Sequence, residues 1–155
     1  MPIINKFTSF LENLSKVTGI DNIALDEKGM LVLSIENIIV SFHYYDLADD
    51  LYLIANLSCI DHGLNDEDKI KQYQKILNLN CFFNQVDDGV LGVPDNSNQV
   101  FYTKKLHPCE LEYSEFEKAL FAYVKKCQEL KAKLNEDTEI TENSQLYNNF
   151  QFLEV

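Results

Sequence analysis

The sequence contains no arginine, and all 13 of its basic residues are lysine. The chain therefore lacks the bidentate donor with which many proteins bind phosphate and guanine. Acidic residues outnumber basic residues by 25 to 13, which gives a net charge of −12 at pH 7, and a net negative field repels polyanions. We therefore expect neither nucleic acid nor an anionic membrane as a partner; a neutral or basic polypeptide fits this charge better.

The sequence also lacks the motifs that mark common catalytic and phosphate-binding sites. It has no G-x-S-x-G, no H-E-x-x-H and no glycine-rich loop, and it contains only five glycines. Carboxylate catalysis needs two carboxylates that face each other across a cleft. The neighbouring acidic residues fall instead in predicted turns or at helix starts: Asp49 and Asp50, Asp66 to Asp68, and Asp87 and Asp88. We expect no enzymatic activity and no cofactor.

No C-x-x-C pair occurs among the four cysteines, which are Cys59, Cys81, Cys109 and Cys127. Cytosolic thiols stay reduced, and a free cysteine packs like a small apolar residue. One alternative is a nucleophilic pair of cysteine and histidine, since such partners meet in space rather than in sequence. Another is a zinc site, if two loops met, but the spacing does not match a structural zinc motif; its ligands would be Cys59, His62, His107 and Cys109. We expect no metal.

The length of 155 residues suits one domain, and the hydrophobic share of 46% indicates a folded chain rather than a disordered one. No apolar run approaches the roughly 20 residues that cross a bilayer. Residues 1–6 do not have the pattern of a signal peptide. We expect a cytoplasmic protein.

Three amphipathic helices are expected. The first covers residues 2–18, and the second follows an N-cap at Asn65. The third opens at a capping box formed by Ser114 and Glu117. The apolar face of the first helix comprises Ile3, Phe7, Phe10, Leu11, Leu14 and Val17.

Five strands are expected between these helices, and residues 23–26 are a candidate for a further short strand. Glu36 and Asn37 separate the first two strands by the spacing of a hairpin. The five strands are at residues 30–35, 38–44, 51–58, 90–93 and 99–106. This pattern predicts an α+β fold with the order α-β-β-β-α-β-β-α and a twisted antiparallel sheet flanked by helices.

The middle helix and the strand after it carry more apolar surface than one small sheet can cover. Large exposed apolar patches normally mark interfaces. We therefore expect a homodimer formed through the middle helix, with an interface that contains Ile70, Tyr73, Ile76, Leu77, Val90 and Leu91.

We place the domain at residues 1–134 and an acidic, mobile tail at residues 135–155. The first part of the tail has too little apolar surface to offset its ordering entropy of about 1–2 kcal/mol per residue. Its end is more apolar, with Leu146, Tyr147, Phe150, Phe152 and Leu153. Two alternatives stay open: the end folds back on the domain, or it docks on another protein.

Four stretches taken together resemble one protein family. They are IALDEKG at residues 23–29, DLYLIANL at 50–57, ILNLNCFF at 76–83 and GVLGV at 89–93. Their order and spacing are similar to those of the class I type III secretion chaperones, the family of the chaperone for translocated intimin receptor. The chain departs from the family pattern at Asn98, where glycine is usual, and at Leu130, where tryptophan is common.

The resemblance implies a homodimer that binds the N-terminal region of a secreted effector. In this family the effector wraps around the chaperone in an extended, non-globular form and stays export-competent without nucleotide. A second implied partner is the secretion ATPase or sorting platform. The alternative from another functional class is a non-catalytic α+β interaction or regulatory module in a different complex.

An extended client segment gains affinity from backbone pairing at a sheet edge and specificity from side-chain pockets. We expect it to lie along the sheet and the first helix. The alternative is that the helix residues of this set are ordinary core. The candidate pocket residues are Phe7, Phe10, Leu14, Ile39, Phe42, Tyr52 and Ile54.

Overall fold

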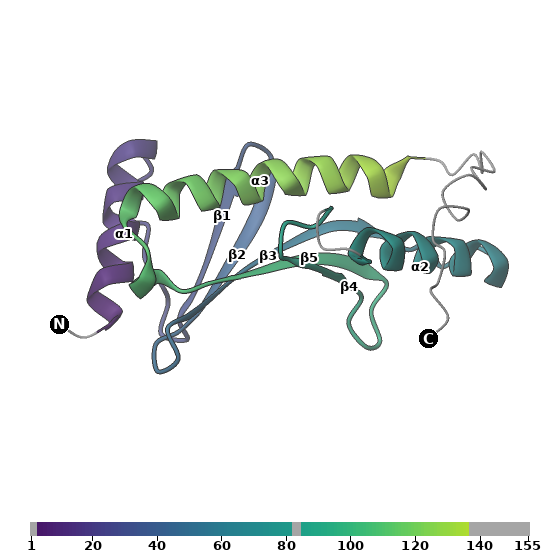
Figure 1. The fold of residues 1–155 in the computed structure, drawn as a ribbon, viewed down its shortest axis with the longest axis horizontal. Coiled ribbons are helices and arrows are strands. Elements are labelled where there is room, and N and C mark those ends of the chain that lie inside the picture. The colour runs from purple at the N-terminus through teal and green to yellow at the C-terminus, as the bar shows by residue number, and fades with distance from the viewer. Residues whose placement is uncertain (1–2, 82–84, 137–155) are drawn as a thin grey trace, which may run out of the picture.

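A computed structural model describes residues 3–81 and 85–136. Its elements follow the predicted order, which is confirmed (Figure 1). The helices are α1 (Ile3–Thr18), α2 (Asp66–Asn80) and α3 (Tyr113–Asn135), with a short 3-10 turn, η1 (Pro108–Glu110), before α3. The strands are β1 (Met30–Ile35), β2 (Ile38–Tyr45), β3 (Asp50–Cys59), β4 (Val90–Gly92) and β5 (Gln99–Leu106).

The five strands form one antiparallel sheet in the order β1-β2-β3-β5-β4. In Figure 1, α3 lies lengthwise over the sheet, α1 crosses near the start of α3, and α2 lies beside β4. Buried and accessible side chains alternate along β2 and β3, because successive residues of a strand point to opposite faces. One face therefore forms the core with α1 and α3; the residues on the other face lie outside it.

Residues with positive φ form the turn between β1 and β2 and the tight approach just before β1. Glu36 and Asn37 both have positive φ, of 49° and 66°, as a two-residue hairpin turn requires. Gly29 has φ of 75°, and a Cβ there would lie 2.5 Å from the carbonyl oxygen of Tyr44. Glycine is therefore required where the loop after α1 meets the end of β2.

Two local predictions are wrong. Residues 23–26 do not form a strand; Asp26 instead closes the turn before β1, with its carboxylate accepting from the backbone N–H groups of Lys28 and Met30. The capping box of α3 lies two residues earlier than predicted. Glu112 is the N-cap, and Glu115 accepts a hydrogen bond of 2.8 Å from its backbone N–H.

The predicted boundary of the domain falls at the end of α3. The helix ends at Asn135, and Glu136 caps it. Residues 137–155, most of the predicted tail, lie outside the described residues. Within the described ranges, no helix combines the length and apolar character that crossing a membrane demands.

Cys127 should resist thiol reagents while the protein is folded. Its side chain is buried in the core, and burial raises the pKa of the thiol to about 12, whereas Cys59, Cys81 and Cys109 are exposed. Only the thiolate reacts. We expect an aromatic disulfide reagent at pH 8 to modify Cys127 at least about 100-fold more slowly than the other three, because modification requires opening of the core. Peptide mapping by mass spectrometry measures this; equal rates at all four positions would contradict the burial.

Candidate partner-binding surfaces

The sheet face opposite α1 and α3 carries an apolar stripe. Val32 lies opposite Ser41, and Ser41 lies opposite Ile54, so the three residues form one row across β1, β2 and β3. Val32 and Ile39 are exposed, Ile39 to 65%, and Ile54 is half-buried. An apolar stripe on an open sheet face is suited to contact a partner.

A polar rim borders this stripe at the start of β3. Oδ1 of Asp50 lies 2.8 Å from Nζ of Lys105, with which it forms a salt bridge, and 3.3 Å from Nδ1 of His107. The ring of Tyr52 packs edge-on against Tyr45, with 5.8 Å between ring centroids. Together with Ile54, these tyrosines line a shallow hollow on the open face. Aromatic surface beside a paired charge can hold an extended chain and fix its register.

Four of the predicted pocket residues lie in the core instead. Phe7, Phe10, Leu14 and Phe42 are buried, and Phe10 stacks on Phe116 with 5.3 Å between ring centroids. The structure therefore favours the alternative of ordinary core for the helix residues, and Phe42 shares their environment. A partner cannot reach these four side chains in this conformation. The candidate set reduces to Ile39, Tyr52 and Ile54.

Sequence reasoning missed a second hollow, beside α1. It has a volume of about 720 Å³ and lies between α1, the loop before β1 and the turn after β2. Leu47 in that turn is 98% exposed, and Leu25 lines the hollow from the loop. In the sequence, the only indication of this hollow was the presence of Leu25 and Leu47 in two turns. The fold brings these two turns together.

The predicted dimer residues divide into two groups. Ile76 and Leu91 are buried within the protomer, so they do not offer a surface to a second chain. Ile70, Tyr73 and Leu77 follow the spacing of one helix face and are exposed, Leu77 to 66%. Val90, on β4, is exposed as well. Of the predicted dimer residues on α2, those that a second chain can reach therefore lie on the outward face of the helix.

Asn80 attaches the end of α2 to β4, which is an edge strand. Its side-chain amide donates to the carbonyl oxygen of Leu91 at 2.8 Å and accepts from the N–H of Leu91 at 2.9 Å. A side chain thus occupies the hydrogen-bonding groups that a neighbouring strand would use. This contact fixes the orientation of the outward face of α2 relative to the sheet.

Replacing Asn80 with alanine should lower the free energy of unfolding by about 1–3 kcal/mol, because both backbone groups of Leu91 lose their partner. Urea unfolding followed by circular dichroism measures the change. Asn78→Ala is the matched control, since Asn78 is exposed on the same helix and the change in helix propensity is identical. Equal effects of the two substitutions would show that the bridge to Leu91 contributes nothing.

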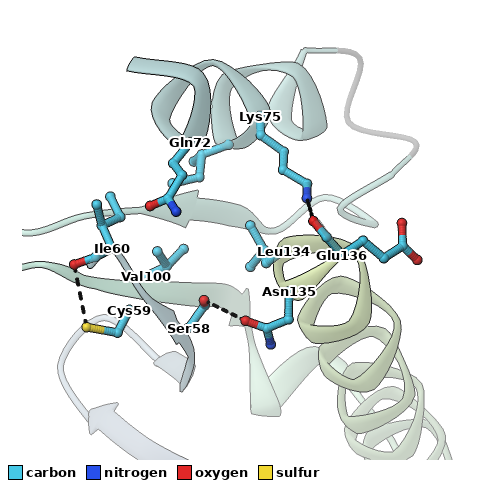
Figure 2. A pocket seen from close by; sticks show the side chains of 10 residues that line it. Ser58, Cys59, Ile60, Gln72, Lys75, Val100, Leu134, Asn135 and Glu136 are labelled. Atoms are coloured by element: carbon cyan, nitrogen blue, oxygen red, sulfur yellow. Dashed lines mark hydrogen bonds between the residues drawn. The ribbon is translucent and has the colours of Figure 1, made fainter. Parts of the chain in front are cut away.

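Figure 2 shows a small pocket where α2, the end of β3 and the end of α3 meet. Two hydrogen bonds close it: Lys75 donates to the carbonyl oxygen of Glu136 at 2.8 Å, and Ser58 donates to the side chain of Asn135 at 3.0 Å. Its volume of about 200 Å³ is below the roughly 300–1,000 Å³ typical of small-molecule sites. The pocket is therefore small for a ligand site. Its two hydrogen bonds hold the end of α3 against α2 and β3.

The strand register excludes the zinc site considered from the sequence. Cys59 lies opposite Gln99 at one end of the β3–β5 pair, whereas Leu106, directly before His107, lies at the other end. The two pairs of cysteine and histidine therefore cannot share one metal ion in this fold. Among the described residues, no group of three or more histidine, cysteine, aspartate and glutamate side chains could hold a metal.

Residues 9–131 match the sequence model of the Tir chaperone protein (CesT) family. No curated protein matches the sequence.

Three solved structures share the fold at low identity. One is the crystal structure of the ExsC-ExsE complex, with a TM-score of 0.73 and 19% identity over 89% of this chain and 100% of that chain. Another is the HopA1-SchA chaperone–effector complex, with a TM-score of 0.61 and 14% identity over 84% and 94%. The third is the Yersinia pestis type III secretion chaperone SycH in complex with a fragment of YscM2, with a TM-score of 0.57 and 18% identity over 80% and 98%.

Proposed function

The chain belongs to the Tir chaperone protein (CesT) family, and on this premise we propose that it is a type III secretion chaperone. It binds the N-terminal region of a secreted effector in an extended, non-globular form and keeps that effector soluble and export-competent. Structures with the same fold include a chaperone–effector complex and a type III secretion chaperone, as their names state.

The observation that carries this proposal is the open apolar face of the sheet. The face has three accessible candidate contacts, Ile39, Tyr52 and Ile54, and the charged pair of Asp50 and Lys105 at its rim. An extended segment can place alternate side chains on such a face, whereas a folded domain needs a larger complementary surface.

The charge of the chain supports a polypeptide partner. With a net charge of −12 and no arginine, the chaperone attracts neutral or basic segments and repels nucleic acid. It acts in the cytoplasm, where the client is made, and it acts by binding without catalysing a reaction.

The active form is a homodimer joined through the outward face of α2. Ile70, Tyr73 and Leu77 supply the apolar core of this interface. A second copy doubles the client surface, so that one client segment can contact both protomers.

Co-expression with the secretion system, followed by purification and native mass spectrometry, tests the function. We expect two copies of the chaperone with one copy of a secreted protein. Limited proteolysis should leave a protected client segment near the client's N-terminus. A partner that is never secreted, and that binds through a folded domain, would instead support a regulatory module of another complex.

A further inference from the structure

The sheet opens between β2 and β3. The two strands pair from Tyr45 opposite Asp50 to Ser41 opposite Ile54, and the pairing stops there. Beyond this point, residues 38–40 pair with β1 alone, and residues 55, 56, 58 and 59 pair with β5 alone, with a register shift between Asn56 and Ser58. Figure 1 shows the β1–β2 hairpin diverging from β3 and β5. Two strand edges thus face each other without a strand between them in the described part of the chain.

A hollow of about 270 Å³ lies at this opening. Ile39 on one edge, Ile54 on the other and Phe101 of β5 give it an apolar lining. Lys131 also lines it, although this residue belongs to α3, which covers the opposite face of the sheet. The hollow therefore reaches between the two arms of the sheet.

A neighbouring hollow, lined by the β1–β2 turn and the last part of α3, connects the opening with the end of the described structure at Glu136. It shares Ile38 and Lys131 with the first hollow and extends along α3 to Asn135, the last residue of that helix. Residues 137–145 can span roughly 30 Å when extended, at about 3.3 Å per residue. The last ten residues of the sequence can therefore reach the opening.

The sequence of these ten residues suits a strand. Phe150 and Phe152 flank the polar Gln151, and aromatic residues favour strands. Leu146, Tyr147 and Leu153 add further apolar surface. Their end also carries Glu154. Lys131 makes no ion pair with any described residue, so the lining of the opening offers an unpaired cation to an acidic side chain.

We propose that residues 146–155 of the same chain dock in the opening between β2 and β3 as an added strand, with Phe150 and Phe152 against Ile39, Ile54 and Phe101. A strand in this position would pair with the two free edges, which otherwise leave backbone groups available to other chains. The tail then covers the apolar surface at Ile39 and Ile54 until a client displaces it; this last step rests on the proposed function.

Photo-crosslinking in the full-length chain tests the docking without any client. A benzophenone amino acid replaces Phe152, and the crosslinked peptides are identified by mass spectrometry. We expect crosslinks to residues 38–41, 54–56 or 101 of the same chain. The same probe at Asn143, three residues before the docked segment, should not reach residues 54–56 or 101. Crosslinks elsewhere on the domain, or only between two copies of the chain, would overturn the proposal.

Hydrogen exchange gives an independent measurement. In the full-length double variant Phe150→Asp/Phe152→Asp, the backbone amides of residues 38–40 and 55–57 should exchange about tenfold faster than in the unsubstituted chain. The control Asn148→Asp/Asn149→Asp adds the same charge and should leave these amides protected. Unchanged exchange in the phenylalanine variant would overturn the docking. Docking would still stand if no secreted client were found, so its failure and that of the proposed function are distinguishable.

Discussion

Replacing Leu77 with aspartate should convert the proposed homodimer to a monomer. Leu77 is 66% exposed on the outward face of α2, and in a two-fold dimer one substitution removes two contacts. Burying a leucine contributes about 1.5–3 kcal/mol, so the loss is about 3–6 kcal/mol before the cost of burying the new carboxylates. Sedimentation equilibrium at micromolar concentration should then give 17.9 kDa, against twice that mass for the unsubstituted chain.

Leu47→Asp is the matched control for this substitution. Leu47 is 98% exposed in the turn after β2, away from α2, so the same chemical change should leave the dimer intact. Leu47→Asp should keep the melting temperature within a few degrees, because exposed substitutions rarely change stability by more than about 0.5 kcal/mol. Leu77→Asp should melt at a lower temperature, because the folded protomer loses the stabilisation that dimerisation provides, and its circular dichroism spectrum should still be that of the folded chain. An unsubstituted chain that sediments as a monomer would refute the proposed interface.

Local signals in the sequence predicted the order of elements correctly. Asn65 caps α2 as expected, accepting from the N–H of Asp68 at 2.9 Å. The two-residue spacing at Glu36 and Asn37 predicted a hairpin, and both residues adopt the required positive φ. These signals depend on interactions within a few residues, so they do not depend on how the rest of the chain packs.

Periodicity could not show which apolar residues a partner can reach. Phe7 and Leu14 on α1 lie seven residues apart, and Tyr73 and Leu77 on α2 lie four residues apart. Both spacings place the two residues on one face of a helix. The first face is buried under α3 and the sheet, whereas the second is exposed. A helical pattern identifies an apolar face, but only the packing of the whole chain determines what covers it.

Contacts between distant segments were equally inaccessible from the sequence. Asn80 lies in the stretch ILNLNCFF that carries the family resemblance, but its two hydrogen bonds to Leu91 depend on how α2 packs against the sheet. The lengths of β2 and β3 were predicted almost correctly, yet their pairing stops at Ser41 and Ile54. The opening follows from tertiary geometry that no local pattern encodes.

Replacing Ile39 with aspartate should abolish tight client binding while the fold and the dimer persist. Ile39 is 65% exposed on the open face, so the folded protomer loses little. In the complex the client would bury this side chain, which contributes about 1.5–3 kcal/mol, and a carboxylate there adds a desolvation cost. We expect the dissociation constant for the N-terminal segment of the co-purified effector to rise at least about 10–100-fold, measured by isothermal titration calorimetry.

Val17→Asp provides the matched control for this experiment. Val17 is also β-branched and is 63% exposed near the end of α1, so the substitution adds the same charge to a similar environment outside the sheet. It should bind the client as the unsubstituted chain does. Phe42→Asp, which places a carboxylate in the core, should instead unfold the protein. Unchanged affinity in the Ile39 variant would show that the client does not use the open face, and the hollow beside α1 would become the next surface to test.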